Sequence, residues 1–300
     1  MTNTSQPSRL EISVERPLSA ETHALLRYVR DVAAQLDTGF VVAGATARDL
    51  VLWHVYGIRA ERATRDVDVA VCAVSWEAHD KLVALLLATG RFAAHKEKRH
   101  SLNFHDPDVG AAVPLDLVPF GDVEAPAGEI AWPPRGEFVM NVLGFREAVD
   151  TAINIDIGDG LVVPVVSLPA LALLKLLAWH DRRTRKNTDA SDLLLVIRHY
   201  LRAGNEERIW TIASDLLEAH GFDLDLAAAT LLGRETRAIA LSATVDAVTP
   251  LLTDEGTYDT LRRDVLARAA AQLLEDFADS SDRILAAFRD GFLSPQSGAV

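Results

Sequence analysis

The segment DVDVAV at residues 66–71 alternates acidic or small residues with valines. Because side chains on a β-strand point alternately to its two faces, Asp66 and Asp68 share one face and the valines share the other. The valine face can be buried, whereas two neighbouring carboxylates need a cation or hydrogen-bond donors beside them. The segment therefore predicts a buried strand that presents two acids on one face of a sheet.

A second segment with the same pattern is AAVPLDLVPF at residues 111–120, where Leu115 and Leu117 share one face and Asp116 projects from the other. If this strand pairs beside residues 66–71, three carboxylates converge. That arrangement can hold one or two Mg²⁺ (or Mn²⁺) ions against the phosphates of a substrate. The alternative is a solvated sheet edge whose charges prevent association with another sheet.

The segment GATARDL at residues 44–50 couples the end of a predicted strand to the start of a predicted helix. We expect Thr46 to cap this helix, with Asp49 closing a capping box. The backbone N–H groups of Ala45 and Thr46 then point outward at the positive end of the helix dipole, which favours bound phosphate. A glycine between a strand and a helix is common, so Gly44 alone is a weak indicator.

The order of periodic segments predicts an α+β fold. Up to about residue 166, helical segments alternate with strands, which indicates a mixed sheet flanked by helices. From Ser167 onward the pattern is almost entirely helical. The sequence therefore predicts a flexible tail at residues 1–16, an α/β domain at 17–166 and an all-helical domain at 167–300.

Lys175 is the only charged residue in LPALALLKLLAW, at residues 168–179. A lysine on an otherwise apolar helix is costly to bury without an anionic partner. Trp179 and Arg182 fall near the same stripe, which could grip a triphosphate or a polynucleotide and offer a stacking surface. The alternative is a lysine that extends to solvent at a domain boundary. Asp189 stands in the first turn of the next helix, where the dipole favours an acid regardless of function.

Together these motifs resemble the DNA polymerase beta-like nucleotidyltransferase superfamily. Its pattern is a glycine turn that opens a helix, an Asp-x-Asp pair and a third aspartate on a neighbouring strand. The matching positions are Gly44-Ala45-Thr46, Asp66-x-Asp68 and Asp116. Ala45 departs from the family's second glycine or serine, so a hydroxyl contact to phosphate falls to Thr46 or is absent. The opening GATARDL is also similar to that of enzymes that add CCA to tRNA.

Within that superfamily, residues 38–200 resemble the AbiEii-type nucleotidyltransferases, the toxins of abortive-infection and type IV toxin–antitoxin systems. The matching features are Thr64, Lys175, Arg182 and the Asp189/Asp192 pair. The resemblance implies a polymerase-beta-like nucleotidyltransferase domain and transfer of a nucleoside monophosphate (NMP) from a nucleoside triphosphate (NTP) to an acceptor hydroxyl. RNA, in particular a tRNA 3′ end, is the implied acceptor, and a cognate antitoxin protein is an implied partner.

The resemblance also implies roles for single residues. Asp66, Asp68 and Asp116 would hold the metal ions, and Asp116 would help to activate the acceptor hydroxyl. The turn from Gly44 to Thr46 would bind phosphates, with Arg48 and Lys175 neutralising the leaving group and Asp189 orienting Lys175 or the base.

The net charge of −13 argues against a protein that coats DNA or RNA through a global positive field, and no DNA partner is expected. Local basic segments occur at residues 95–100 and 180–186. A small molecule or a protein as acceptor, or a non-catalytic nucleotide-binding regulator with the same fold, therefore stays open. One cysteine and the absence of a signal-peptide pattern predict a cytoplasmic protein, and the prolines and lysine within residues 161–179 exclude a membrane span.

Overall fold

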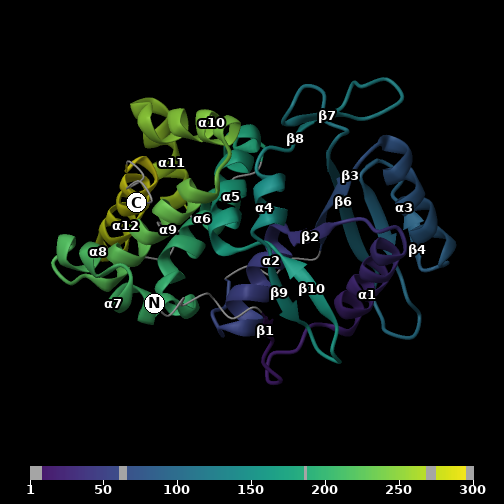
Figure 1. Ribbon diagram of the computed structural model, residues 1–300, viewed down its shortest axis with the longest axis horizontal. Coiled ribbons are helices and arrows are strands. Elements are labelled where there is room, and N and C mark those ends of the chain that lie inside the picture. Colours follow the sequence, from purple (N-terminus) through teal and green to yellow (C-terminus); the bar gives the residue numbers. More distant parts are fainter. Residues whose placement is uncertain (1–8, 61–65, 186–187, 268–274, 295–300) are drawn as a thin grey trace. The chain divides into compact units, whose positions relative to one another are not determined.

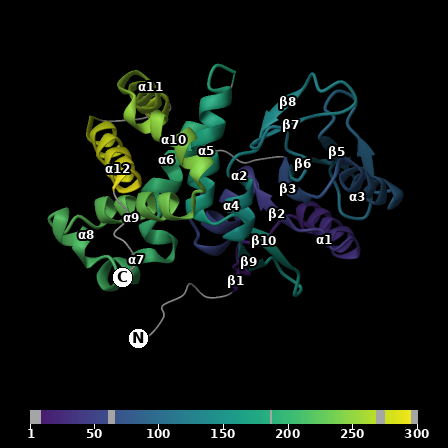
Figure 2. The ribbon, with the colours of Figure 1, turned by 45° about the horizontal axis from the view of Figure 1, so that its top comes forward.

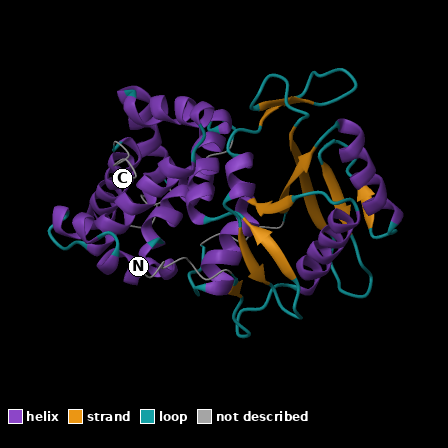
Figure 3. Cartoon of the chain, in the orientation of Figure 1, coloured by secondary structure: helices purple, strands orange, loops and turns teal. Residues whose placement is uncertain are grey.

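The computed structural model describes residues 9–60, 66–185, 188–267 and 275–294 (Figure 1). Its internal contacts divide the chain into two compact units, Met1–Ser167 (unit 1) and Leu168–Val300 (unit 2). Strands occur in unit 1, and the described residues of unit 2 form helices only (Figure 3). The predicted α+β fold class is confirmed.

Within the described residues, unit 1 is built on a mixed sheet of eight strands. In sheet order they are β1 (Leu10–Glu11), β9 (Ile153–Asp156), β10 (Val162–Val165), β2 (Phe40–Ala43), β3 (Val67–Ala73), β6 (Val113–Gly121), β5 (Ser101–Phe104) and β4 (Phe92–Ala94). The central strands β3 and β6 run parallel, while β2 and β5 pair antiparallel to them. A separate antiparallel pair is formed by β7 (Glu129–Ala131) and β8 (Val139–Asn141).

Helices cover the sheet of unit 1. They are α1 (Ala20–Gln35), α2 (Gly44–Asp49) with its π-helical continuation η1 (Leu50–Val55), α3 (Trp76–Ala88) and α4 (Phe145–Asp150). Ser19 and Ser75 cap α1 and α3, because each hydroxyl accepts a hydrogen bond from a first-turn amide. Helix α1 packs against α3 and β6, and α4 packs against β2 and β6. The valines of β3 are buried in this core, as their alternation predicted.

The start of α2 differs from the prediction. The helix begins at Gly44, and the residue before it, Ala43, makes no side-chain cap. Thr46 lies inside the first turn, 5% exposed, and its hydroxyl donates to the backbone oxygen of Asp66 at 3.0 Å. The predicted capping box at Thr46 and Asp49 is therefore wrong, since the hydroxyl has a tertiary acceptor in the segment that leads into β3.

The predicted N-terminal tail also contains structure. Leu10 and Glu11 form β1, which extends the sheet by pairing parallel to β9. Arg9 forms an ion pair with Asp156 of β9. Residues 10–11 are part of the sheet because the edge of β9 provides hydrogen-bond partners for their backbone. Local periodicity in the sequence cannot indicate a partner strand so far away.

Unit 2 is a helical assembly. Its helices are α5 (Leu168–Arg182), α6 (Thr188–His199), η2 (Leu201–Asn205), α7 (Glu206–Thr211), α8 (Ser214–Ala219), α9 (Leu224–Ile239), α10 (Ser242–Thr253), α11 (Glu255–Leu266) and α12 (Glu275–Leu293). Helices α9 and α12 pack closely at two glycines: a Cβ on Gly233 would overlap the backbone of Phe288, and one on Gly291 would overlap that of Thr230. Glycine at both positions lets the two backbones touch.

The apolar run at residues 161–179 is divided between β10 and α5. Among the described helices, none combines the length and the hydropathy that crossing a membrane requires.

Candidate active site

The central strands align four residues in one row across the sheet. Ala43 at the end of β2 pairs with Asp68 of β3, and Asp68 pairs with Asp116 of β6. Asp116 pairs in turn with Ser101, the first residue of β5. The predicted pairing of the two carboxylate-bearing strands is thus confirmed, and it places Asp68 and Asp116 side by side on one face.

The side chains of Asp66, Asp68 and Asp116 converge at this row. Each offers a carboxylate oxygen, and these three oxygens lie within 4.8 Å of one another on partly exposed residues. Like charges this close repel one another unless a cation lies between them. A set made only of carboxylate oxygens suits a hard divalent cation such as Mg²⁺ or Mn²⁺ better than a soft metal. The three aspartates can therefore hold a metal ion.

Gly44 is required at its position by the shape of this site. Its φ of +61° lies in the left-handed region, and a Cβ there would overlap Asp68 Oδ2 and lie 2.6 Å from Asp68 Cγ. The absence of a side chain lets the turn approach the carboxylate directly. The glycine turn and the Asp-x-Asp pair, about twenty residues apart in sequence, are in contact in the fold.

We expect Gly44→Ala to weaken metal binding at the three aspartates, because the new methyl group must displace Asp68 and the residue pays the cost of a positive φ. The unfolding free energy is expected to fall by about 1–3 kcal/mol for the same reasons. Titration with Mn²⁺ followed by calorimetry measures the first effect, and urea unfolding measures the second. Gly90→Ala is the matched control, since Gly90 also has a positive φ but a Cβ there meets nothing within 4 Å. Equal Mn²⁺ affinity in the two variants would contradict this role of Gly44.

Three other residues predicted to bind phosphate, Ala45, Thr46 and Arg48, belong to the helix that this turn opens. Ala45 is 7% exposed, and Thr46 is directed to the backbone of Asp66. Arg48 is 1% exposed, and its Nε donates to Asp49 at 2.7 Å. Thr64 lies outside the described residues. The first backbone N–H groups of α2 have no hydrogen-bond acceptor within the helix.

Two neighbours of Asp116 were not identified from the sequence. The buried hydroxyl of Ser101 donates to Asp116 Oδ1, and His100 Nε2 lies 3.9 Å from Asp116 Oδ2. Burial lowers the pKa of His100, against the opposing influence of the Asp116 carboxylate. The available signal was the segment HSLNFHD: a strand there that pairs beside residues 111–120 places Ser101 next to Asp116.

A second charged cluster lies within unit 2. Lys175 Nζ donates to Asp189 Oδ1 at 3.0 Å and to Asp192 Oδ2 at 2.7 Å. Arg182 also donates to Asp189, through Nε at 2.7 Å and a terminal nitrogen at 2.9 Å. Burial of Asp189 opposes its ionisation, but the hydrogen bonds from Arg182 and the charge of Lys175 hold the pKa of its carboxyl below the ordinary value. Lys175 is thus buried with anionic partners rather than extended to solvent.

The interpretation of Trp179 as a stacking surface is wrong. Its side chain is fully buried, and its Nε1 donates to Asp264 Oδ2 at 2.8 Å. The helix stripe that contains Trp179 and Lys175 faces the interior of the helical unit. A buried indole N–H needs one hydrogen-bond acceptor, and Asp264 of α11 provides it.

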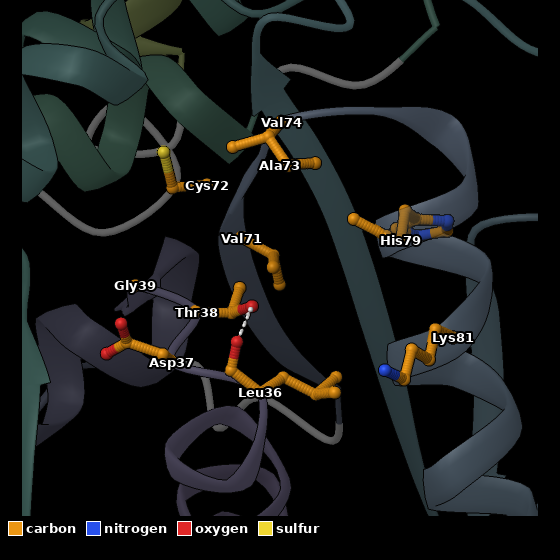
Figure 4. A pocket seen from close by; sticks show the side chains of 11 residues that line it. Leu36, Asp37, Thr38, Gly39, Val71, Cys72, Ala73, Val74, His79 and Lys81 are labelled. Atoms are coloured by element: carbon orange, nitrogen blue, oxygen red, sulfur yellow. Dashed lines mark hydrogen bonds between the residues drawn. The ribbon is translucent and has the colours of Figure 1, made fainter.

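A cavity of about 280 Å³ lies at the other end of β3, between the end of α1 and the start of α3 (Figure 4). Cys72 and His79 are among its lining residues, and Thr38 donates across one side of it to the Leu36 backbone oxygen at 3.4 Å. None of the three aspartates lines it. Cys72 is four residues from Asp68, or about 13 Å along the strand. This cavity is therefore separate from the carboxylates.

A glycine turn packed against aspartates on adjacent strands of a mixed sheet matches the pattern by which the sequence resembles nucleotidyltransferases. Comparison with protein families gives the same class and narrows it: a model described as "Nucleotidyl transferase AbiEii toxin, Type IV TA system" matches residues 27–290. The chain belongs to this family of nucleotidyltransferase enzymes.

Several solved structures are similar to the chain at low identity. An antigenic nucleotidyltransferase-like protein from Paracoccidioides brasiliensis is 19% identical, with a TM-score of 0.43, and the match covers 71% of this chain and 94% of that one. The antibiotic-resistance factor ANT(2″)-Ia is 17% identical, with a TM-score of 0.37, covering 68% and 98%. The Thermotoga maritima CCA-adding enzyme, complexed with tRNA, is 11% identical, with a TM-score of 0.25, covering 94% and 81%. No curated protein matches the chain.

Proposed function

We propose that this chain is a Mg²⁺-dependent nucleotidyltransferase that moves an NMP from an NTP to the 3′ hydroxyl of an RNA, with a tRNA as the expected acceptor. The observation that carries the proposal is the convergence of Asp66, Asp68 and Asp116, whose oxygens lie within 4.8 Å of one another. Membership of the AbiEii family supports transfer of a nucleotide and a role as a toxin with a cognate antitoxin protein.

In this proposal the three aspartates hold the metal, which when bound supplies positive charge against the phosphate oxygens. The acceptor oxygen forms a bond to the α-phosphorus, the bond from that phosphorus to the bridging oxygen breaks, and pyrophosphate leaves. Asp116 helps to remove the proton of the acceptor hydroxyl, and Ser101 fixes the orientation of Asp116 by donating to its Oδ1.

The turn at Gly44 binds the phosphates that leave. Its first backbone N–H groups lie at the positive end of α2, and Gly44 has no side chain that would keep a triphosphate away from Asp68. Arg48 is the nearby cation proposed for the same phosphates, although its guanidinium is directed to Asp49 in this structure. Lys175, Arg182 and Asp189 are proposed to serve the same reaction.

The decisive experiment supplies each labelled NTP in turn, with Mg²⁺ and total cellular RNA. We expect label from at least one NTP to appear at RNA 3′ ends, with one pyrophosphate released per nucleotide added. Transfer should stop when the metal is removed with EDTA and should return with Mg²⁺. Blocking the RNA 3′ hydroxyl by periodate oxidation is the matched control.

Two outcomes would contradict the proposal in different ways. Label in a small molecule or in a protein, with none in RNA, would replace the acceptor but keep the reaction. Binding of an NTP without any pyrophosphate release across all acceptors would indicate a non-catalytic nucleotide-binding regulator.

A further inference from the structure

A strip of exposed positive charge and aromatic rings adjoins Asp116. We call it the basic-aromatic surface and define it as Lys96, Lys98, Arg99, His100 and Phe138. The three cations lie in the loop between β4 and β5, and Phe138 directly precedes β8. Resting on the proposed function, we propose that this surface binds the single-stranded 3′ end of the RNA acceptor, with its terminal base stacked on Phe138.

The position of the surface follows from the strand order. In the row across the sheet, the Gly44 turn follows β2, on one side of Asp68, whereas His100 precedes β5, on the far side of Asp116. A triphosphate held at the turn therefore leaves the β5 side of the carboxylates to the other substrate. His100 Nε2 is 3.9 Å from Asp116 Oδ2, so the surface begins directly at the site of transfer.

The rings are arranged as a platform. The rings of His100 and Phe138 are stacked with centroids 5.8 Å apart and planes only 8° from parallel. Buried Trp132 supports the imidazole from a second direction, with centroids 6.0 Å apart. Phe138 itself is 45% exposed. A large ring held parallel to another and left open to solvent offers one more π-face, to which any nucleobase can be added.

The two segments that form the surface are joined to each other. Arg99 donates to the backbone oxygen of Pro133 at 2.6 Å, which fixes the β4–β5 loop against the segment before β8. Figures 1 and 2 show β7 and β8 near β6, the strand that carries Asp116. The rings and the cations therefore belong to one surface of unit 1.

The charge of the surface matches a polyanion. Lys96, Lys98 and Arg99 are exposed and are accompanied within their loop by the single carboxylate of Glu97. Neither lysine forms an ion pair with any residue that the structure describes. The chain as a whole has a net charge of −13, so this positive cluster beside the aspartates is opposite in sign to the net charge of the protein. Cations next to a stacking ring are the combination by which proteins bind single strands through backbone and base together.

The test uses the full chain and a fluorescent single-stranded RNA oligonucleotide with a free 3′ hydroxyl, in EDTA and without NTP. We expect Phe138→Ala to weaken RNA binding at least about fivefold, the lower end of what one stacked base contributes. Phe138→Tyr keeps the ring and should bind as the wild type does. His100 is left unchanged because of its closeness to Asp116. Phe222→Ala is the matched control, since Phe222 is an exposed ring of unit 2 (67%).

The cations are tested by salt dependence. Lys96→Ala combined with Lys98→Ala should reduce the slope of log affinity against log salt by about 1.4, which corresponds to two lost contacts to single-strand phosphates. The exposed pair Arg27→Ala and Lys81→Ala, on α1 and α3, should leave the slope unchanged. In the transfer assay, the KM for RNA should rise in both the Phe138→Ala and the double-lysine variants, while the KM for NTP stays the same.

RNA affinity and salt slope that are unchanged in both variants would overturn the assignment. If the wild type still adds nucleotides to RNA in that case, the proposed function stands and another surface holds the acceptor. If the wild type neither binds nor extends RNA, both the acceptor surface and the RNA part of the proposed function fail.

Discussion

Asp68→Asn is expected to lower the rate of nucleotide transfer by at least about a thousandfold while leaving the fold intact. Asparagine has nearly the same shape as aspartate, so it fits against Gly44, but it removes one of the three negative charges that are proposed to hold a cation. Several kcal/mol of transition-state stabilisation depend on a metal in such a site, and each 1.4 kcal/mol is a factor of ten in rate. The initial rate of pyrophosphate release measures the effect.

Metal binding supplies a readout for Asp68→Asn that does not depend on turnover. Addition of Mn²⁺ should raise the thermal midpoint of the wild type, because a ligand of the folded state alone stabilises that state, and should raise the midpoint of the variant much less. Asp150→Asn changes an exposed carboxylate at the end of α4 and serves as the control. Expression of the wild type should arrest growth and that of Asp68→Asn should not. Transfer by Asp68→Asn at more than about a tenth of the wild-type rate would refute the assignment of Asp68.

Lys175→Met is expected to lower the unfolding free energy by about 3–5 kcal/mol. The ammonium group of Lys175 contacts both Asp189 and Asp192, and all three side chains are almost completely buried. Methionine fills similar volume but leaves the carboxylates without this cation, and removing one member of a buried charged cluster is strongly destabilising. This loss is a large part of the about 5–15 kcal/mol by which a typical domain is stable.

Urea unfolding of Lys175→Met measures the loss of stability, and Lys81→Met is the control because Lys81 is an exposed lysine on α3. The exposed change should alter stability by no more than about 0.5 kcal/mol. Transfer activity, assayed at low temperature where the variant is folded, then separates two roles. Stability lost with activity retained would restrict Lys175 to holding α5 and α6 together, and activity lost from a folded variant would support its proposed role in the reaction.

The central part of the fold could be predicted because its signal is local and periodic. Alternation around Asp68 and around Asp116 identifies both strands and the face that each acid occupies, and two such strands bury their apolar faces best by pairing. The change from period two to a helical period near Ser167 marks where the sheet region ends, and the structure divides the chain between Ser167 and Leu168.

The features that could not be predicted depend on partners distant in the sequence. The acceptor of the Thr46 hydroxyl is a backbone oxygen twenty residues away, and β1 exists because β9, about 145 residues later, offers an edge. Trp179 has the right period for a functional stripe, yet Asp264 of α11 satisfies it inside unit 2. Ser101 and His100 lie beside Asp116 because of the register in which β5 pairs with β6, and the sequence alone does not give this register.

The register between β3 and β6 places Asp68 beside Asp116, so it limits where the sequence can change without moving the two carboxylates apart. A slip of one residue would turn Asp116 toward the core, so an insertion or deletion within either strand would separate the proposed metal ligands. The connection between the two strands carries the loop at residues 95–100, and the segment after β6 carries Phe138. Surface loops accept changes of length and composition at little thermodynamic cost. If the proposed acceptor surface is correct, changes in these loops would alter the acceptor while the carboxylates stay in place.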